Sequence, residues 1–259
     1  MPRLLVVPTA AVSDTAAEVI ATALAEAVAA RGVAHWATTG GSAAPGIYRS
    51  LLAPDRLARV PWNRVHTWWG DDRFVPFDHP FSNVQSFDSD LVGVDEDDAG
   101  VGGAPIPAQY IHPIPSPQAL AAGTGPEGAA AAYAEELRAL VPLDAAGTPV
   151  LDLVVLGVGP DGHVLSVFPG SSVWDVPDIT AAVPAPTHVE PHVERVTVHP
   201  RLIAAARAVL VVSAGASKAA SLGQAWTGDD ARGLPVRAAR LPTATWVLDE
   251  AAAAELPRG

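Results

Sequence analysis

The segment from Leu151 to Gly170 constrains the fold more than any other part of the chain. It reads LDLVVLGVGPDGHVLSVFPG, and its first six residues are apolar except for Asp152. A short run of branched apolar side chains is typical of a strand that is covered on both faces of a parallel sheet. Three glycines and Pro160 follow within the next six residues. They end the strand and force a sharp turn at its carboxyl end.

This turn carries two side chains with acid–base chemistry, Asp161 and His163. Ligands of open α/β sheets bind at the carboxyl ends of strands, and Gly159 and Gly162 allow a substrate to approach the backbone. We therefore expect His163 to act as a general base. A short helix beginning at Val164–Val167 would favour its neutral form, because the positive end of a helix disfavours an imidazolium. The alternative is a purely structural loop that Asp161 caps.

Strand and helix patterns alternate along the rest of the chain. This alternation predicts an α/β fold, with a Rossmann-like, open, mostly parallel sheet and helices on both faces, in a single domain over residues 1–259. The proline- and glycine-rich segment 93–125 interrupts it, and the acidic run Asp95–Asp98 predicts a solvated surface loop. The expected strands are residues 4–7, 33–38, 64–69, 151–156, 195–198, 208–213 and 245–248. The expected helices lie in 13–31, with Ser13 as N-cap, and in 47–52, 126–140, 218–222 and 249–256.

Composition limits the partners of the chain. The formal net charge of −12 opposes binding to nucleic acid or to an anionic membrane, since the long-range field repels both. No uncharged apolar run is long enough to span a membrane. The chain contains no cysteine, which suits a reducing cytoplasm, and we expect a cytoplasmic protein that is a monomer or weak homodimer. A small anionic ligand would instead need a local cluster of basic side chains.

Three places in the sequence could bind an anion. Gly40, Gly41 and Ser42 follow an apolar strand and precede helical spacing, so free N–H groups and a helix end would meet there. Arg73 follows the next strand, and its planar guanidinium suits phosphate. Lys218, the only lysine, stands in the first turn of a predicted helix, where its charge opposes the helix dipole. An ordinary loop, a solvated turn and an exposed lysine are the alternatives.

Two other motifs resemble binding sites but lack the surrounding features that such sites need. His188 and His192 lie four residues apart, but Pro191 is incompatible with the helix that would bring both rings to one metal ion. The glycines at 157, 159 and 162 fit the dinucleotide pattern G-x-G-x-x-G. However, Pro169 comes too soon for the long helix that follows this motif, and no clear acidic residue ends a strand about twenty residues later. We expect no metal and no cofactor.

These motifs resemble the signatures of the 6-phosphogluconolactonase family. The family pattern Asp-x-x-x-Leu-Gly-x-Gly-x-Asp-Gly-His, followed by Ser-Leu-Phe-Pro-Gly, matches residues 152–170, with Val164 and Leu165 in place of Thr-Ala. Its Ser-Gly-Gly-Ser-Thr-Pro segment is similar to residues 39–45, where Pro45 falls one place late. Similar blocks follow in order at residues 71–76 with 82–83, 195–198, 215–218 and 246–249, so the resemblance covers nearly the whole chain.

The resemblance implies hydrolysis of 6-phospho-D-glucono-1,5-lactone to 6-phosphogluconate, in the oxidative pentose phosphate pathway. His163 would activate water, and Asp161 would orient the base or contact the sugar. Backbone N–H groups of the Gly40–Gly41 or the Gly157–Gly162 turn would hold the oxyanion, and both remain open. The implied substrate-binding residues are Gly40, Gly41, Ser42, Asp72 in the place of the family's Glu, Arg73, Asn83, Gly159, Gly162, Arg195 and Lys218.

Two rival functions remain. Hexosamine-6-phosphate deaminases and sugar-phosphate isomerases of the same superfamily share the turn that ends in histidine, but continue into Phe-Asn-Glu-Pro-Gly. This chain has Ser166-Val-Phe-Pro-Gly there, without the carboxylate. A sugar-phosphate sensor that binds without turnover is the second rival. Replacing His163 by Ala separates the classes, because an enzyme should lose turnover and keep its ligand.

Overall fold

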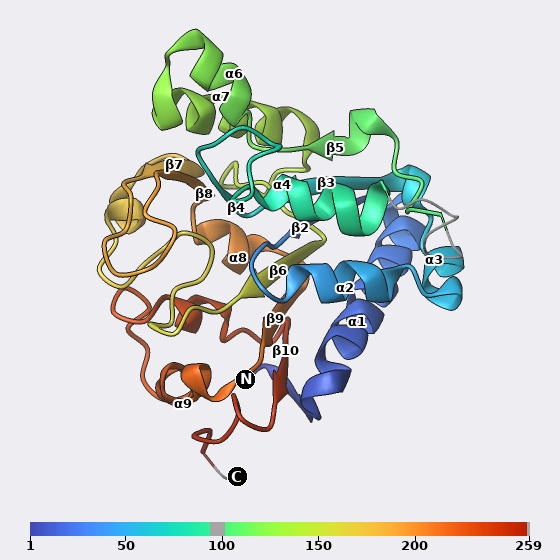
Figure 1. Ribbon diagram of the computed structural model, residues 1–259, viewed down its shortest axis with the longest axis vertical. Helices are drawn as coiled ribbons and strands as arrows, with labels where there is room; N and C mark the ends of the chain where they lie inside the picture. The colour runs from blue at the N-terminus through green and yellow to red at the C-terminus, as the bar shows by residue number, and fades with distance from the viewer. Residues whose placement is uncertain (94–101, 258–259) are drawn as a thin grey trace.

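A seven-stranded parallel sheet forms the centre of the protein (Figure 1). The computed structural model describes residues 1–93 and 102–257, so the acidic run expected to form a surface loop lies outside the described residues. The strand order is β1-β10-β9-β6-β2-β3-β5, and each neighbouring pair is parallel. The predicted fold class is confirmed. The strands are β1 (Arg3–Val7), β2 (Ala34–Thr38), β3 (Val65–Trp69), β5 (Ile111–His112), β6 (Leu153–Gly157), β9 (Val209–Ser213) and β10 (Ala244–Asp249).

Helices cover both faces of this sheet. Trp68 and Trp69 are adjacent in β3 and fully buried, and adjacent strand residues point to opposite faces. Trp68 packs against Tyr133 of α7, and Trp69 packs edge-on against Phe87 of α4. The helices are α1 (Val12–Arg31), α2 (Ala44–Leu51), α3 (Pro54–Arg59), α4 (Asn83–Phe87), α6 (Ser116–Ala122), α7 (Gly125–Leu140), α8 (Arg201–Ala205) and α9 (Ala219–Trp226). No helix in the described part is long and apolar enough to cross a membrane.

The order of the strands reverses between β2 and β6. From β2 the chain proceeds outward to β3 and β5, and then returns to place β6 on the other side of β2. In open α/β sheets this arrangement leaves a crevice at the carboxyl ends of the two central strands, because their loops diverge. The two ends remain joined, since the N–H of Gly157 donates to Oγ1 of Thr39 at 3.3 Å.

A second, antiparallel sheet was not predicted. It consists of β4 (Asp71–Arg73), β8 (Arg195–Val198) and β7 (Thr180–Val183), in that order from edge to edge. The sequence predicted the strand at 195–198, but it predicted no strand at residues 71–73, which follow the expected strand 64–69. The register pairs Arg73 with Arg195, although they are far apart in the chain.

Several local predictions were wrong. Residues 164–167 form a tight turn rather than a helix, with an antiparallel bridge between Val164 and Val167. Helix α1 begins at Val12 and has no side-chain cap, so Ser13 is not its N-cap. The expected helix over 249–256 is a series of turns, and the segment 93–125 contains β5 and α6.

Asp72 holds the segment after β4 in place. Its side chain is 2% exposed and accepts hydrogen bonds from the backbone N–H groups of Arg73 and Asn83, both at 2.8 Å, and from the Ser82 hydroxyl at 2.9 Å. Burial raises the pKa of Asp72 to about 7, and these hydrogen bonds oppose the rise. The side chain therefore fixes the start of α4 against β4, and with it Arg73 and Asn83.

The pH dependence of stability should reveal this buried carboxyl group. Because its pKa is raised on folding, its stabilising contribution is complete below about pH 4 and is lost as the pH rises through 7. One pKa unit corresponds to about 1.4 kcal/mol, so the parent should lose roughly 2 to 4 kcal/mol in free energy of unfolding relative to Asp72→Asn between pH 4 and pH 8. Urea denaturation at several pH values measures this difference.

The matched control is Asp78→Asn, at an exposed carboxylate. As the pH rises, the parent should lose more free energy of unfolding relative to Asp72→Asn than relative to this control. Equal pH dependence for the two variants would contradict the buried, proton-binding carboxyl group.

Candidate active site

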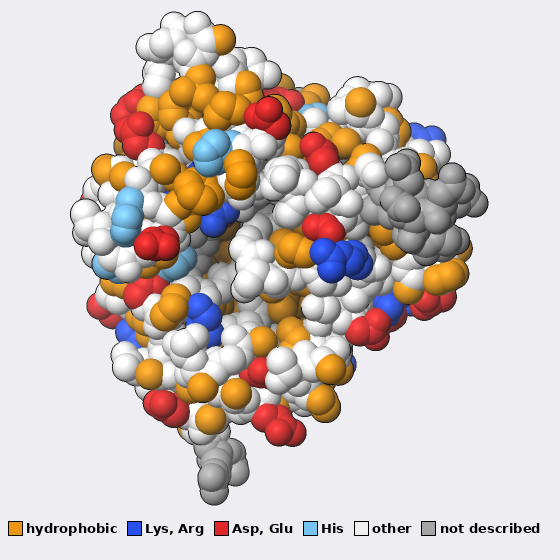
Figure 2. Space-filling view, in the orientation of Figure 1, with side chains coloured by type: hydrophobic (Ala, Val, Ile, Leu, Met, Phe, Trp, Pro, Cys, Tyr) orange, Lys and Arg blue, Asp and Glu red, His pale blue; other side chains and the backbone are white. Residues whose placement is uncertain are grey.

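A cavity of about 420 Å³ opens at the crevice between the carboxyl ends of the central strands. Figure 2 shows a hollow near the middle of this face, with basic side chains and histidines along its left side. Most of the predicted site residues line the cavity. They are Gly40, Gly41, Ser42, Arg73, Asn83, Gly159, His163, Arg195 and Lys218.

Asp161, Gly162 and Asp72 do not line the cavity. The sequence placed Asp72 at the substrate, whereas its side chain is buried beneath β4 and does not line the cavity. Gly162 is likewise a packing residue. Its φ is +79°, and a Cβ there would lie 2.2 Å from Cδ1 of Leu234.

Asp161 makes a short hydrogen bond to His163. Its Oδ1 lies 2.5 Å from Nδ1 of the imidazole and also accepts from the backbone N–H of His163 at 3.2 Å. Burial acts to raise the pKa of Asp161, but the hydrogen bonds and charge of His163 outweigh it and lower the pKa well below its usual range. Asp161 is therefore an ionised carboxylate that is hydrogen-bonded to Nδ1 of His163. The other ring nitrogen, Nε2, is left to exchange a proton. No helix follows His163, so the expected helix dipole does not act on the ring.

The glycine turn is braced from behind by the segment between α9 and β10. The N–H of Val236 donates to the carbonyl of Gly162 at 2.9 Å, and the N–H of Gly170 donates to the carbonyl of Arg232 at 2.8 Å. Leu234 fills the space beside Gly162. These contacts fix the backbone on both sides of His163.

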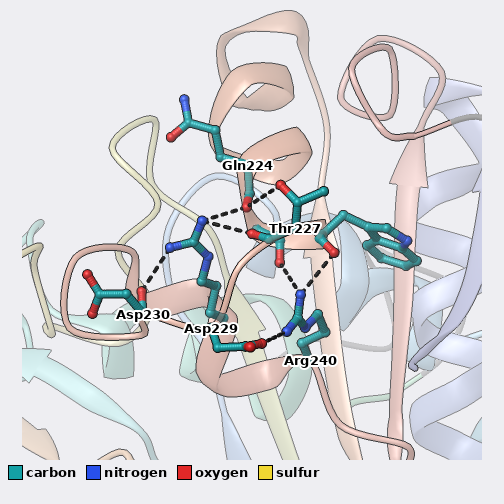
Figure 3. Close-up of polar contacts among 8 residues, drawn as sticks. Gln224, Thr227, Asp229, Asp230 and Arg240 are labelled. Carbon is teal, nitrogen blue, oxygen red and sulfur yellow. Dashed lines mark hydrogen bonds and ion pairs between the residues drawn. The ribbon is translucent and has the colours of Figure 1, made fainter.

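Two arginines hold that bracing segment (Figure 3). Arg237 donates to the backbone carbonyls of Gln224 at 2.8 Å, Thr227 at 2.9 Å and Asp230 at 3.0 Å. Arg240 donates to the Trp226 carbonyl at 2.9 Å and to the Asp229 carboxylate. The end of α9 and the loop that follows it thus form one hydrogen-bonded unit.

Arg73 and Arg195 lie on neighbouring strands and line the same cavity. Arg73 donates to the Phe81 carbonyl at 3.2 Å and to Oδ1 of Asn83, while Arg195 donates to the Pro191 carbonyl at 3.1 Å. The Nε atoms of both arginines are buried without a partner among the described residues. Burial lowers the pKa of Arg195, and the charge of Arg73 acts in the same direction. Like charges at paired positions repel, so an anion in the cavity would stabilise the pair.

Lys218 adds a third positive charge to this cavity. It precedes α9 as its N-cap, as the sequence predicted for the start of that helix, and it makes no ion pair with any described residue. Burial lowers its pKa, against the opposing charge of Asp161. The cavity therefore attracts an anion even though the net charge of the chain is negative.

The Gly40–Ser42 turn offers free donors. The N–H groups of Gly41 and Ser42 have no hydrogen-bond partner within the described residues, whereas those of Gly157, Gly159 and Gly162 are used inside their own turn or by Thr39. A Cβ on Gly40 would overlap the Asn83 side chain, 1.8 Å from its Oδ1. The turn before α2 therefore has free N–H donors at the cavity.

The sequence missed two site residues, Asp71 and His188. Asp71 lines the cavity, and its Oδ2 accepts from the Ser166 hydroxyl at 2.5 Å. Strand alternation was the available signal, because Asp71 and Arg73 share a face of β4 and Asp72 points the other way. His188 reaches Asp161, with Nε2 3.0 Å from its Oδ2. The described residues contain no cluster of three or more side chains able to hold a metal ion.

Comparisons with known proteins agree with this geometry. The chain is 34% identical over 257 residues to a 6-phosphogluconolactonase of Streptomyces coelicolor, covering 95% of this chain and 91% of the relative. A Mycobacterium leprae 6-phosphogluconolactonase is also 34% identical, over 92% of this chain and 91% of its own length. The structure of Trypanosoma brucei 6-phosphogluconolactonase superposes with a TM-score of 0.82 at 26% identity, covering 99% of both chains.

A monomeric glucosamine-6-phosphate deaminase shares the fold, with a TM-score of 0.77 at 18% identity over 98% of this chain and 99% of its own. The family model described as glucosamine-6-phosphate isomerases/6-phosphogluconolactonase matches residues 8–248. Because this match covers most of the chain, the protein belongs to the glucosamine-6-phosphate isomerase/6-phosphogluconolactonase family.

Proposed function

We propose that this protein hydrolyses 6-phospho-D-glucono-1,5-lactone to 6-phospho-D-gluconate. The observation that carries the proposal is a single cavity lined by an acid–base group and three cations. His163 lines it together with Arg73, Arg195 and Lys218. A phosphorylated lactone offers both an electrophilic carbonyl and a dianion to such a site. The names of the curated relatives support the same substrate.

His163 acts as the general base in this proposal. Its Nε2 accepts a proton from water as the oxygen of that water bonds to the lactone carbonyl carbon. The tetrahedral intermediate then collapses, the bond from this carbon to the ring oxygen breaks, and Nε2 returns the proton to the departing oxygen. Asp161, at 2.5 Å from Nδ1, stabilises the imidazolium that forms in between. Water and substrate balance the reaction, so these steps need no metal or cofactor.

Basic side chains hold the phosphate group of the substrate in this proposal. Arginine binds phosphate through parallel N–H donors, and both Arg73 and Arg195 line the cavity. Lys218 contributes its ammonium group from the start of α9. The free N–H groups of Gly41 and Ser42 would then stabilise the oxyanion of the tetrahedral intermediate.

Replacing His163 by Gln should abolish most of the activity. General acid–base catalysis contributes about 10²- to 10⁴-fold, so kcat should fall within that range while KM changes little. The measurement is lactone disappearance with and without protein, corrected for spontaneous hydrolysis. A variant with the turnover of the parent would remove His163 from the mechanism.

Replacing Lys218 by Met should weaken binding of the phosphate. Losing a charged hydrogen bond costs about 1.5 to 3 kcal/mol, so kcat/KM should fall roughly 10- to 100-fold, mainly through KM. The non-phosphorylated lactone should lose much less. The matched control is Arg64→Met, since Arg64 is exposed and does not line the cavity. An equal loss for both lactones would show that Lys218 does not read the phosphate.

The rival function, a hexosamine-6-phosphate deaminase, predicts release of ammonia in place of lactone hydrolysis. Asp71 is the one carboxylate among the described residues that line the cavity, and it is bound to Ser166. We therefore expect no ammonia from glucosamine 6-phosphate. Ammonia release with unaccelerated lactone decay would overturn the proposed function, and ligand binding without either reaction would indicate a sensor.

The cytoplasmic location and the monomer or weak homodimer belong to this proposal as well. The absence of cysteine supports a reducing compartment. Sedimentation at several protein concentrations would determine the oligomeric state.

A further inference from the structure

The carboxylate of Asp161 lies between two imidazoles. Its Oδ1 is 2.5 Å from Nδ1 of His163, and its Oδ2 is 3.0 Å from Nε2 of His188. The Phe168 ring touches both histidines, with centroid distances of 4.7 Å to His163 and 5.5 Å to His188. Each carboxylate oxygen therefore has its own imidazole partner.

We propose that His188 is a positioning residue for His163 and acts through Asp161. The inference rests on the proposed function, in which Nε2 of His163 takes the proton from water. That role requires the tautomer with the proton on Nδ1, which Asp161 Oδ1 selects by accepting the hydrogen bond. A carboxylate held at one oxygen can rotate about its Cβ–Cγ bond. His188 holds the second oxygen and so fixes the plane of the carboxylate toward His163.

The surroundings of His188 support a specific role rather than packing. Its side chain is 55% exposed, compared with 15% for His163, so it is not a core residue. Asp161 is its only polar partner among the described residues. The backbone on both sides of His188 is held by other contacts. Arg195 donates to the Pro191 carbonyl at 3.1 Å, and Nδ1 of His192 donates to the Pro186 carbonyl at 2.7 Å. The loop thus presents His188 from a held position.

In the sequence, the spacing of His188 and His192 suggests only a metal site, and Pro191 argues against that site. The structure separates the two histidines: His192 turns back to its own loop, and His188 reaches the glycine turn 27 residues earlier in the chain. The variants that test the inference follow from this difference. His188→Leu removes the donor to Asp161, while His188→Gln keeps an N–H donor near the position of Nε2.

We expect His188→Leu to lower kcat roughly tenfold, less than loss of the base itself, with KM changed less than about twofold. His188→Gln should restore kcat to within about threefold of the parent, because the carboxylate keeps its second hydrogen bond. Thr187→Leu, at an exposed residue of the same loop, should leave kcat unchanged. Equal losses in the two leucine variants, or no rescue by Gln, would overturn the inference in favour of a general effect of the loop.

A double-mutant cycle and an NMR measurement complete the test. In an Asp161→Ala background, His188→Leu should cause no further loss of kcat, since the path through the carboxylate is already gone. A persisting tenfold loss would contradict the inference.

Nitrogen-15 NMR of labelled histidine reads the tautomer of His163 without an activity assay. The parent should hold the Nδ1–H form, and His188→Leu should admit the Nε2–H form. An inactive parent that still shows this change would refute the lactonase function and leave the positioning role intact, whereas an unchanged tautomer would refute the positioning role.

Discussion

All neighbouring strands of the seven-stranded sheet run in the same direction, so the loops that leave them meet at one rim. The loop after β2 brings Gly40–Ser42, the loop after β6 brings His163, and the loop after β9 brings Lys218. Residues separated by more than 170 positions in the chain thereby line one cavity. The position of the site therefore follows from the backbone, from the common strand direction and the reversal of strand order beside β2, whatever side chains line it.

The small antiparallel sheet adds what the parallel sheet cannot supply. Arg195 follows no central strand, and it reaches the cavity only because β8 pairs with β4. The pairing places two positive charges at matching positions, an arrangement that costs stability in the empty protein. Buried Asp72 fixes β4 to the start of α4 and so holds Arg73 in this arrangement. Functional sites commonly hold such unfavourable contacts, which the surrounding fold maintains.

The sequence was sufficient for most strands of the parallel sheet, though not for β5, and for most of the cavity residues. Apolar runs marked the strands, and glycines or polar residues at their carboxyl ends marked the rim, as at Gly40 and His163. It was insufficient where distant segments pair, because no local pattern gives the register of β4 with β8 or the contact of His188 with Asp161. It was also misleading at Leu165, whose φ of +56° suits a turn and not the expected helix. Tertiary packing decides that conformation rather than local propensity.

Lys218 gives the protein an unusual chemical property. It carries the only side-chain amine in the sequence, and burial at the cavity lowers its pKa, which increases the fraction of the nucleophilic, uncharged form. An acylating reagent therefore meets one reactive lysine, and that lysine lines the cavity. The extent of its labelling reports directly on whether the cavity is filled, so that affinities can be measured for compounds that are never turned over.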